Sequence, residues 1–276
     1  SPVTQYRRWA NGTRGVREVM FIRSKLCLVS LVIGMLCAPS QLIAAGGADV
    51  NLEKGKWSFS GPFGFFDKAA LQRGFQVYRE VCAGCHGIDY LAFRNLGDLG
   101  YNAAEIKAIA AEYEVTDGPD DYGDMFERPA LPKDRLIEPY SNEKAARAAN
   151  GGAYPPDLSL ITKARAGGPD YIHALLTGYE DPPSGIKMRD GLYYNPYMAG
   201  GKIAMAAPLL EDLIEYTDGT AASVEQMSYD VVTFLNWAAE PELEERKQTG
   251  FMVLIYLTVF AGLLFFSMRR IWADKH

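Results

Sequence analysis

The chain has 276 residues, of which 48% are hydrophobic and 22% charged, so it can bury a sizeable core and is neither disordered nor collagen-like. Its formal net charge of −6 is unevenly spread, because residues 1–45 carry a net +5 and the remainder a net −11. The net negative charge of residues 46–276 disfavours nucleic acid as a partner and suits a basic protein.

The N-terminal segment has the pattern of a bacterial-type secretory signal. Two basic residues, Arg23 and Lys25, precede a short apolar run over residues 26–37, and small residues follow at 44–47. The alternative is a membrane-spanning helix, which needs about 20 apolar residues to cross a hydrocarbon core of about 30 Å, so the run is too short. We therefore predict that residues 1–45, an N-terminal extension and signal peptide, are absent from the mature protein.

A helix is predicted from about Lys68, with Asp67 as its N-cap. Its apolar residues recur at helical spacing and continue into two cysteines. One face of the predicted helix therefore holds Leu71, Phe75, Tyr78, Cys82 and Cys85.

The two cysteines belong to the sequence Cys82-Ala83-Gly84-Cys85-His86, and C-x-x-C-H is the attachment signature of c-type haem. The thiols would form thioethers with the two vinyl groups of one porphyrin, and His86 would be the proximal ligand of the iron. A zinc knuckle needs a second ligand pair, a thioredoxin-like pair is expected near a βαβ pattern, and a chance disulfide does not need the histidine. One motif predicts one covalently bound haem c.

The residues alone leave the sixth ligand of the iron open. His173 lies in a short predicted helix, where a lone histidine is more often a surface or core residue. Methionine is the other common ligand, and it raises the reduction potential. Small residues and a proline surround Met205, which would let its thioether approach a flat porphyrin, but most methionines simply fill the core. The methionine candidates are Met125, Met188, Met198, Met205 and Met227.

A later helix is predicted to begin with a capping box at Ser223 and to stop before Pro241. In small cytochromes c, an N-terminal and a C-terminal helix cross near the haem. Gly74, Tyr78 and Phe234 suit such a crossing, because a small residue lets the backbones approach and aromatic rings fill the contact. The alternative is that Gly74 only loosens a helix and Phe234 is an ordinary core residue.

The C-terminal segment 250–268 has no charged residue and would reach about 28 Å as a helix, enough to span a bilayer core. A buried core helix would instead show a polar side or an interrupting charge. Two arginines follow the segment, and the positive-inside rule places them in the cytoplasm. We therefore predict a periplasmic haem domain over 46–248, an inner-membrane anchor over 249–268 and a cytoplasmic tail over 269–276.

Five stretches extend the haem motif into a longer pattern that ends in this one apolar helix. They are GFQVYREVCAGCHGIDYLAFRNL, DGPDDYGDMFERP, ARAANGGAYPPDLSLITKARAGGPDYIHALLTGY, GLYYNPYMAGGKIAMAAPLL and VVTFLNWAAEPE. Together they resemble the cytochrome c1 family, the haem subunits of the ubiquinol:cytochrome c oxidoreductase, also called the cytochrome bc1 complex. The resemblance covers about Gly61 to Arg270, and the export signal indicates a bacterial member.

The resemblance implies a mainly α fold, with a cytochrome c-like haem domain, long loop insertions and one C-terminal transmembrane helix. It also implies a ligand set, in which Cys82 and Cys85 carry the thioethers while His86 and Met205 are the axial ligands of the iron. Four further positions match residues of the haem pocket. They are Pro156, whose carbonyl would accept from the proximal imidazole, Arg165 and Tyr171, near the propionates, and Asn150, a polar contact.

The resemblance further implies a one-electron relay, from a Rieske iron–sulfur protein to cytochrome c, beside a cytochrome b subunit in a lipid membrane. The chain is then an enzyme only as a subunit of the oxidoreductase, with no substrate chemistry of its own. The alternatives are a membrane-anchored cytochrome that serves a terminal oxidase, a haem sensor or peroxidase with a labile sixth ligand, and an assembly subunit with a structural haem.

Three acidic clusters, at 112–127, 211–218 and 240–245, fit the steering of a basic cytochrome c toward an exposed haem edge. A charge run is most often a solvated face, and the sequence does not distinguish which cluster contacts the partner.

Overall fold

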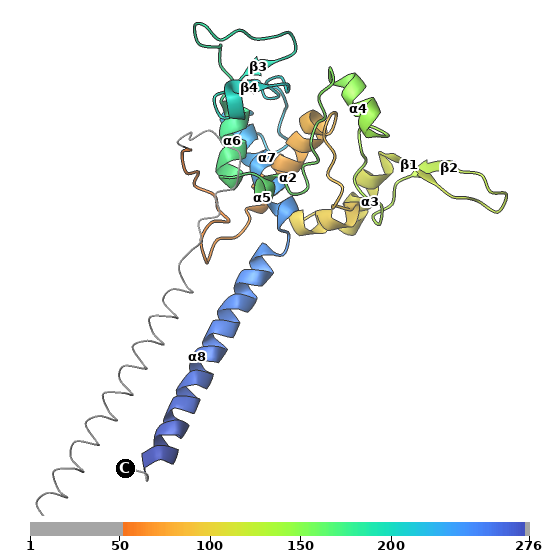
Figure 1. Ribbon diagram of the computed structural model, residues 1–276. Coiled ribbons are helices and arrows are strands. Elements are labelled where there is room, and N and C mark those ends of the chain that lie inside the picture. The colour runs from red at the N-terminus through yellow and green to blue at the C-terminus, as the bar shows by residue number, and fades with distance from the viewer. Residues whose placement is uncertain (1–51, 274–276) are drawn as a thin grey trace, which may run out of the picture. The chain divides into compact units, whose positions relative to one another are not determined.

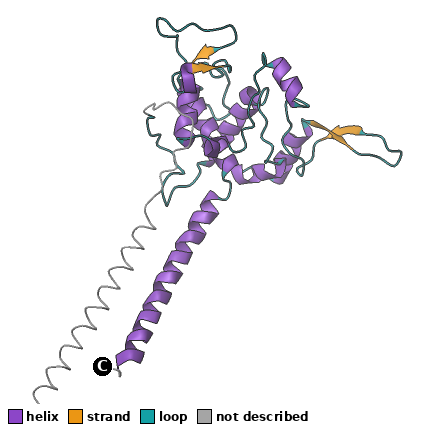
Figure 2. Cartoon of the chain, viewed as in Figure 1, coloured by secondary structure: helices purple, strands orange, loops and turns teal. Residues whose placement is uncertain are grey.

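Helices dominate the regular structure of Leu52–Ala273, the part of the chain that the computed structural model describes (Figures 1 and 2). The predicted extension and signal peptide, residues 1–45, lie outside this part. The α-helices are α2 (Lys68–Val77), α3 (Ala103–Ala111), α4 (Glu143–Ala149), α5 (Ile161–Ala164), α6 (Gly168–Thr177), α7 (Val224–Ala239) and α8 (Leu243–Ala273). A π-helical turn, η1 (Tyr78–Cys82), and two 3-10 segments, η2 (Phe93–Leu99) and η3 (Ala199–Gly201), complete the helices. The predicted mainly α fold is confirmed.

Helices α2 and α7 cross at the centre of the core, as predicted. Asp67 caps α2 by accepting from the backbone amide of Ala69 (2.9 Å). A Cβ atom added at Gly74 would lie 2.0 Å from the carbonyl oxygen of Asp230, so only glycine allows this approach. The ring of Phe234 lies 5.7 Å from that of Tyr78, with both side chains buried. Gly74 is therefore a packing residue.

A buried ion pair reinforces the crossing. Arg73 donates from Nε to Oδ2 of Asp230 (2.8 Å), which is fully buried, and a second nitrogen contacts the half-exposed Asp218 (2.9 Å). Hydrogen bonding to Asp230 raises the pKa of Arg73, so the cation is permanent. Ser223 caps α7 by accepting from the amide of Gln226, but the side chain of Gln226 binds Asp230. The predicted reciprocal capping box is therefore only half formed.

The end of α2 widens into η1, where the amide of Ala83 bonds to the carbonyl of Tyr78, five residues back (2.8 Å). The wider turn changes the direction in which the following side chains point around the helix axis. Phe75 and Tyr78 are buried, but Cys82 is half-buried and Cys85 is exposed. Cys82 still packs against the hydrophobic core, as predicted, but the prediction that Cys85 continues the buried face of α2 is wrong.

Long loops and two short hairpins connect the helices, as the predicted loop insertions require. The first hairpin pairs β1 (Glu114–Asp117) with β2 (Phe126–Pro129) and follows α3 (Figure 1). The second pairs β3 (Tyr193–Tyr194) with β4 (Lys202–Ile203). Because the sheets have two strands each, the core depends on helix packing.

Helix α8 contains the predicted membrane segment and is long and apolar enough to cross a bilayer. Its first residue, Leu243, packs in the hydrophobic core formed by the preceding residues. The charged residues 244–247 belong to the same helix, although the predicted boundary assigned them to the preceding domain. The anchor is thus a direct continuation of the folded body.

Candidate haem site

The C-x-x-C-H motif forms a tight turn at the end of η1. The amides of Cys85 and His86 both bond to the carbonyl of Cys82, at 3.0 and 2.9 Å. Neither thiol is in a disulfide, and burial raises the pKa of the Cys82 thiol to about 12. The turn therefore presents two free thiols and an imidazole from positions 82, 85 and 86.

A backbone carbonyl holds the imidazole of His86. Its Nδ1 lies 2.7 Å from the carbonyl oxygen of Pro156, which can only accept, so Nδ1 carries the proton and Nε2 presents its lone pair. Burial lowers the pKa of His86, and the Pro156 contact and the charge of Asp157 partly oppose that shift. The result is a neutral, oriented imidazole suited to bind a metal.

Two further contacts fix the backbone around His86. The buried hydroxyl of Tyr78 donates to the carbonyl of His86 (3.2 Å). The segment that carries Pro156 is bonded to the residues after the motif, through the amide of Leu158 to the carbonyl of Gly87 (2.9 Å). The helix crossing and the imidazole are therefore mechanically connected, a role of Tyr78 that its helical spacing alone did not indicate.

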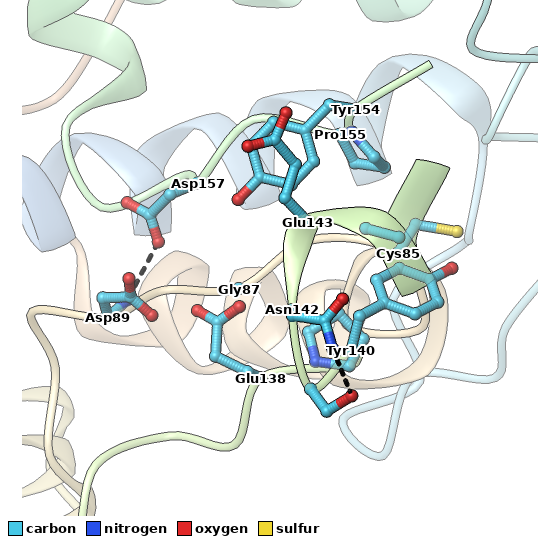
Figure 3. A pocket seen from close by; sticks show the side chains of 13 residues that line it. Cys85, Gly87, Asp89, Glu138, Tyr140, Asn142, Glu143, Tyr154, Pro155 and Asp157 are labelled. Atoms are coloured by element: carbon cyan, nitrogen blue, oxygen red, sulfur yellow. Dashed lines mark hydrogen bonds between the residues drawn. The ribbon is translucent and has the colours of Figure 1, made fainter. Parts of the chain in front are cut away.

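A cavity of about 190 Å³ opens beside the motif (Figure 3). Tyr140, one of its lining residues, donates from its hydroxyl to the carbonyl of Gly84 within the motif (3.4 Å). Asn150, the C-cap of α4, donates from Nδ2 to the Tyr140 hydroxyl (3.1 Å). Asn150 thus reaches the motif through Tyr140, a residue that sequence reasoning missed because no spacing or motif marks it.

Three carboxylates line the same cavity: Asp89, Glu138 and Asp157 (Figure 3). One oxygen from each lies within 4.8 Å of the others. A hydrogen bond with Asp89, together with burial, raises the pKa of Glu138 to about 7. The cavity therefore holds a protonatable group close to the motif.

The predicted distal residue Met205 lies in a loop just after β4. It is half-buried, and its small neighbours at 204, 206 and 207 are exposed. Tyr179 donates from its hydroxyl to the Met205 carbonyl (3.0 Å), and burial raises the pKa of that hydroxyl. The backbone at Met205 is therefore held in place beside small, exposed residues.

Two of the other ligand candidates, His173 and Met227, make contacts elsewhere in the fold. His173 contacts two side chains of α7, with Nδ1 2.8 Å from the hydroxyl of Ser228 and Nε2 3.1 Å from a carboxylate oxygen of Glu225. Met227 is fully buried in the hydrophobic core, and Met125 is exposed on the first hairpin. His173 and Met227 therefore have structural roles, as their helical positions indicated.

Arg165 and Tyr171 lie near each other where α5 passes into α6. Arg165 is exposed, and within residues 52–273 the structure records no carboxylate paired with it. Tyr171 is half-buried, and burial raises its pKa while the charge of Arg165 opposes that shift. The pair places a cation and a phenol in the same region of the fold.

These donors fit a covalent haem. Two free thiols at C-x-x-C spacing stand beside an imidazole with Nε2 available. With the crossed helix pair and the apolar C-terminal helix, they define the class as a membrane-anchored c-type cytochrome.

The chain belongs to the Cytochrome C1 family, whose sequence pattern matches residues 57–275. It is 47% identical to "Cytochrome c1" of Rhodospirillum rubrum, over 90% of this chain and all of that protein. It is 56% identical to "Cytochrome c1 2, heme protein, mitochondrial" of Arabidopsis thaliana, over 85% of this chain and 77% of that protein.

A third relative is longer than this chain. The chain is 45% identical to "Cytochrome b/c1" of Bradyrhizobium diazoefficiens, over 95% of its own length, and it spans 42% of that protein. Membership of the family confirms the resemblance found in the sequence. It also confirms the predicted cofactor, a covalently bound c-type haem.

Proposed function

We propose that this chain is the haem subunit of a bacterial ubiquinol:cytochrome c oxidoreductase, accepting one electron from a Rieske iron–sulfur protein and passing it to cytochrome c. The observation that carries the proposal is the 2.7 Å contact between His86 Nδ1 and the Pro156 carbonyl, in a chain that belongs to the Cytochrome C1 family. An imidazole fixed in this tautomer beside two free thiols is prepared for axial ligation of haem c.

Cys82 and Cys85 would hold the porphyrin through thioethers, with His86 Nε2 and the Met205 sulfur as the axial ligands. When bound, the haem supplies a one-electron couple between ferric and ferrous iron. The Pro156 carbonyl raises the basicity of the imidazole by accepting from Nδ1, and the soft thioether of Met205 favours the reduced metal. The two ligands therefore act on the potential in opposite directions.

The remaining predicted pocket residues would act on the edges of the porphyrin. Arg165 offers a cation to a propionate, and Tyr171 adds a hydroxyl donor beside it. Asn150 would act through Tyr140, because their hydrogen bond directs the phenol toward the carbonyl of Gly84. Asn150 is thus a positioning residue.

The membrane arrangement follows from α8. Its apolar part would anchor the chain in the inner membrane over residues 249–268, with the haem domain, 46–248, in the periplasm and the tail, 269–276, in the cytoplasm. The predicted secretory signal peptide and the arginines after the apolar run support this orientation. A periplasmic haem domain also matches the place where the predicted acceptor, a soluble or tethered cytochrome c, would be found.

Each acidic cluster has some carboxylates that are used inside the protein. In the cluster at 240–245, Glu240 pairs with Lys163 and Arg246, and Glu244 accepts from the amide of Phe66. In the clusters at 112–127 and 211–218, Asp117 pairs with Arg128 and Asp218 pairs with Arg73. The remaining carboxylates of all three clusters would steer a basic partner.

Purification of the detergent-solubilised complex tests the proposal. We expect a cytochrome b and a Rieske protein to copurify, and ubiquinol to reduce the haem of this chain only when the Rieske protein is present. Copurification with a terminal oxidase, or reduction without the Rieske protein, would contradict the relay. Carbon monoxide binding to the reduced protein at neutral pH would contradict a tight sixth ligand and favour a sensor or peroxidase.

A further inference from the structure

The loop at residues 60–66 exposes two aromatic rings that the haem site does not use. The side chains of Phe63 and Phe65 are 81% and 63% exposed, whereas the neighbouring Phe59 and Phe66 are buried in the core. The loop, Ser-Gly-Pro-Phe-Gly-Phe-Phe, contains no charged residue. Adjacent exposed phenylalanines on an uncharged loop form an apolar surface rather than an ordinary solvated turn.

This loop is fixed to the first turns of α8. The ring of Phe63 lies 6.3 Å from that of Phe251, edge to face. Lys247 donates from Nζ to the carbonyls of Phe59 (2.7 Å) and Gly64 (2.9 Å). A Cβ atom at Gly64 would lie 2.1 Å from the carbonyl of Ser60, so the turn is tight. The loop and the start of the anchor therefore form one local unit.

The contact with Phe251 sets the position of the loop relative to the membrane that α8 would span. Phe251 is the second residue of the uncharged run 250–268, so it lies where the apolar part of α8 begins. The headgroup region on each side of a bilayer is several ångströms thick, similar to the distance between the two rings. A ring packed against Phe251 therefore lies at the membrane boundary, where aromatic side chains are favoured.

Several backbone polar groups of the loop are paired inside the chain. Lys247 binds the carbonyls of Phe59 and Gly64, the amide of Phe65 bonds to the carbonyl of Ser58 (3.1 Å), and the amide of Phe66 bonds to Glu244 (2.7 Å). Unpaired backbone groups are what makes an irregular loop costly in lipid. With these groups paired inside the chain, the rings can enter lipid at low cost.

We propose that Phe63 and Phe65 insert into the outer headgroup boundary of the membrane that α8 spans, forming a second membrane contact that fixes the tilt of the haem domain. The occupant of this surface is lipid, because the apolar surface continues that of α8. The inference rests on the proposed role of α8 as the anchor.

Nitroxide labels at single introduced cysteines test this in the membrane complex, reconstituted in vesicles of phosphatidylethanolamine and phosphatidylglycerol. Phe63→Cys carries the test label, Tyr122→Cys on the first hairpin, 92% exposed, is the water control, and Val259→Cys in α8 is the lipid control. The spectrum of the complex without an introduced cysteine is subtracted. Collision rates with oxygen and with a water-soluble nickel chelate are then measured for each label.

We expect the oxygen-to-nickel ratio at position 63 to be several-fold above that at position 122 and below that at position 259. A ratio equal to that at position 122 would overturn the proposal. Protection of position 63 from both reagents would also overturn it, by assigning the loop to a protein contact. A water-like ratio at position 259 would instead refute the anchor itself, so the two failures are distinguishable.

Discussion

The α-carbon of Gly74 lies so close to the backbone of Asp230 that a methyl group there would sit 2.0 Å from the carbonyl oxygen. This approach brings the rings of Tyr78 and Phe234 together, and Tyr78 in turn contacts the carbonyl of His86. Core packing and haem ligation therefore share one helix crossing.

Gly74→Ala is expected to destabilise the haem-loaded protein by about 1–3 kcal/mol, because the backbones of α2 and α7 cannot move apart without disturbing the core. Guanidinium titration of the holoprotein measures the change. Gly97→Ala is the matched control, since a Cβ atom there meets only Ile106 at an ordinary 3.7 Å. Equal stability of the two variants would contradict the close crossing.

Removing Asp230 should cost more than removing Asp218, although both bind Arg73. Asp230 is fully buried, so Asp230→Ala removes the buried partner of Arg73 and leaves that cation only the more exposed Asp218, which should cost about 3–5 kcal/mol. Asp218 is 43% exposed, so Asp218→Ala should cost about 0–1 kcal/mol. The same denaturant titration compares them, and a reversed order would refute the buried pair as the main contact.

Met205→Leu should remove the sulfur ligand of the iron. We expect a lower reduction potential, loss of the sulfur-to-iron charge-transfer band of the ferric protein, and carbon monoxide binding to the ferrous protein. Axial ligands set haem potentials over a range of about 0.8 V, so a large shift is expected. Met198→Leu is the control and should leave the spectrum and potential unchanged. An unchanged spectrum in Met205→Leu would assign the ligand elsewhere.

Glu138 should make stability depend on pH. Its pKa is raised to about 7 in the folded protein, chiefly by the hydrogen bond with Asp89, so the folded state retains a proton that the unfolded state has lost. Its contribution is complete below the ordinary pKa of a glutamate and is lost as the pH rises to about 7.

Unfolding measured between about pH 4 and 8 tests this contribution. The wild type should lose stability relative to Glu138→Gln as the pH rises through this window, and Asp89→Asn should reduce the same loss. Parallel curves for the wild type and Glu138→Gln would show that the carboxylate pair does not retain the proton.

Local patterns in the sequence predicted much of this architecture. Asp67 and the spacing of Leu71, Phe75 and Tyr78 predicted the start and the buried face of α2, because capping and helical periodicity act within a few residues. The apolar helix α8 could also be predicted from local sequence, because its length and lack of charge identify it without reference to the rest of the fold.

The misses depended on tertiary contacts or on rare backbone geometry. The π-helical turn η1 has no sequence marker, so the exposure of Cys85 was not foreseen. The side chain of Gln226 binds Asp230, four residues along the same helix, instead of closing the capping box, and the burial of Asp230 against Arg73 of α2 is set by the tertiary fold. Tyr140 was missed because its contact with Gly84 spans 56 residues of sequence.

The widened turn at Tyr78–Cys82 has a consequence for the design of artificial haem proteins. In a regular α-helix each residue advances the side chain by about 100°, so loss of the extra residue would rotate both thiols by about that angle while leaving the upstream packing intact. A C-x-x-C-H motif grafted onto an ideal helix would therefore present its sulfurs about 100° away from their direction in this fold. The graft would need one inserted residue before the first cysteine.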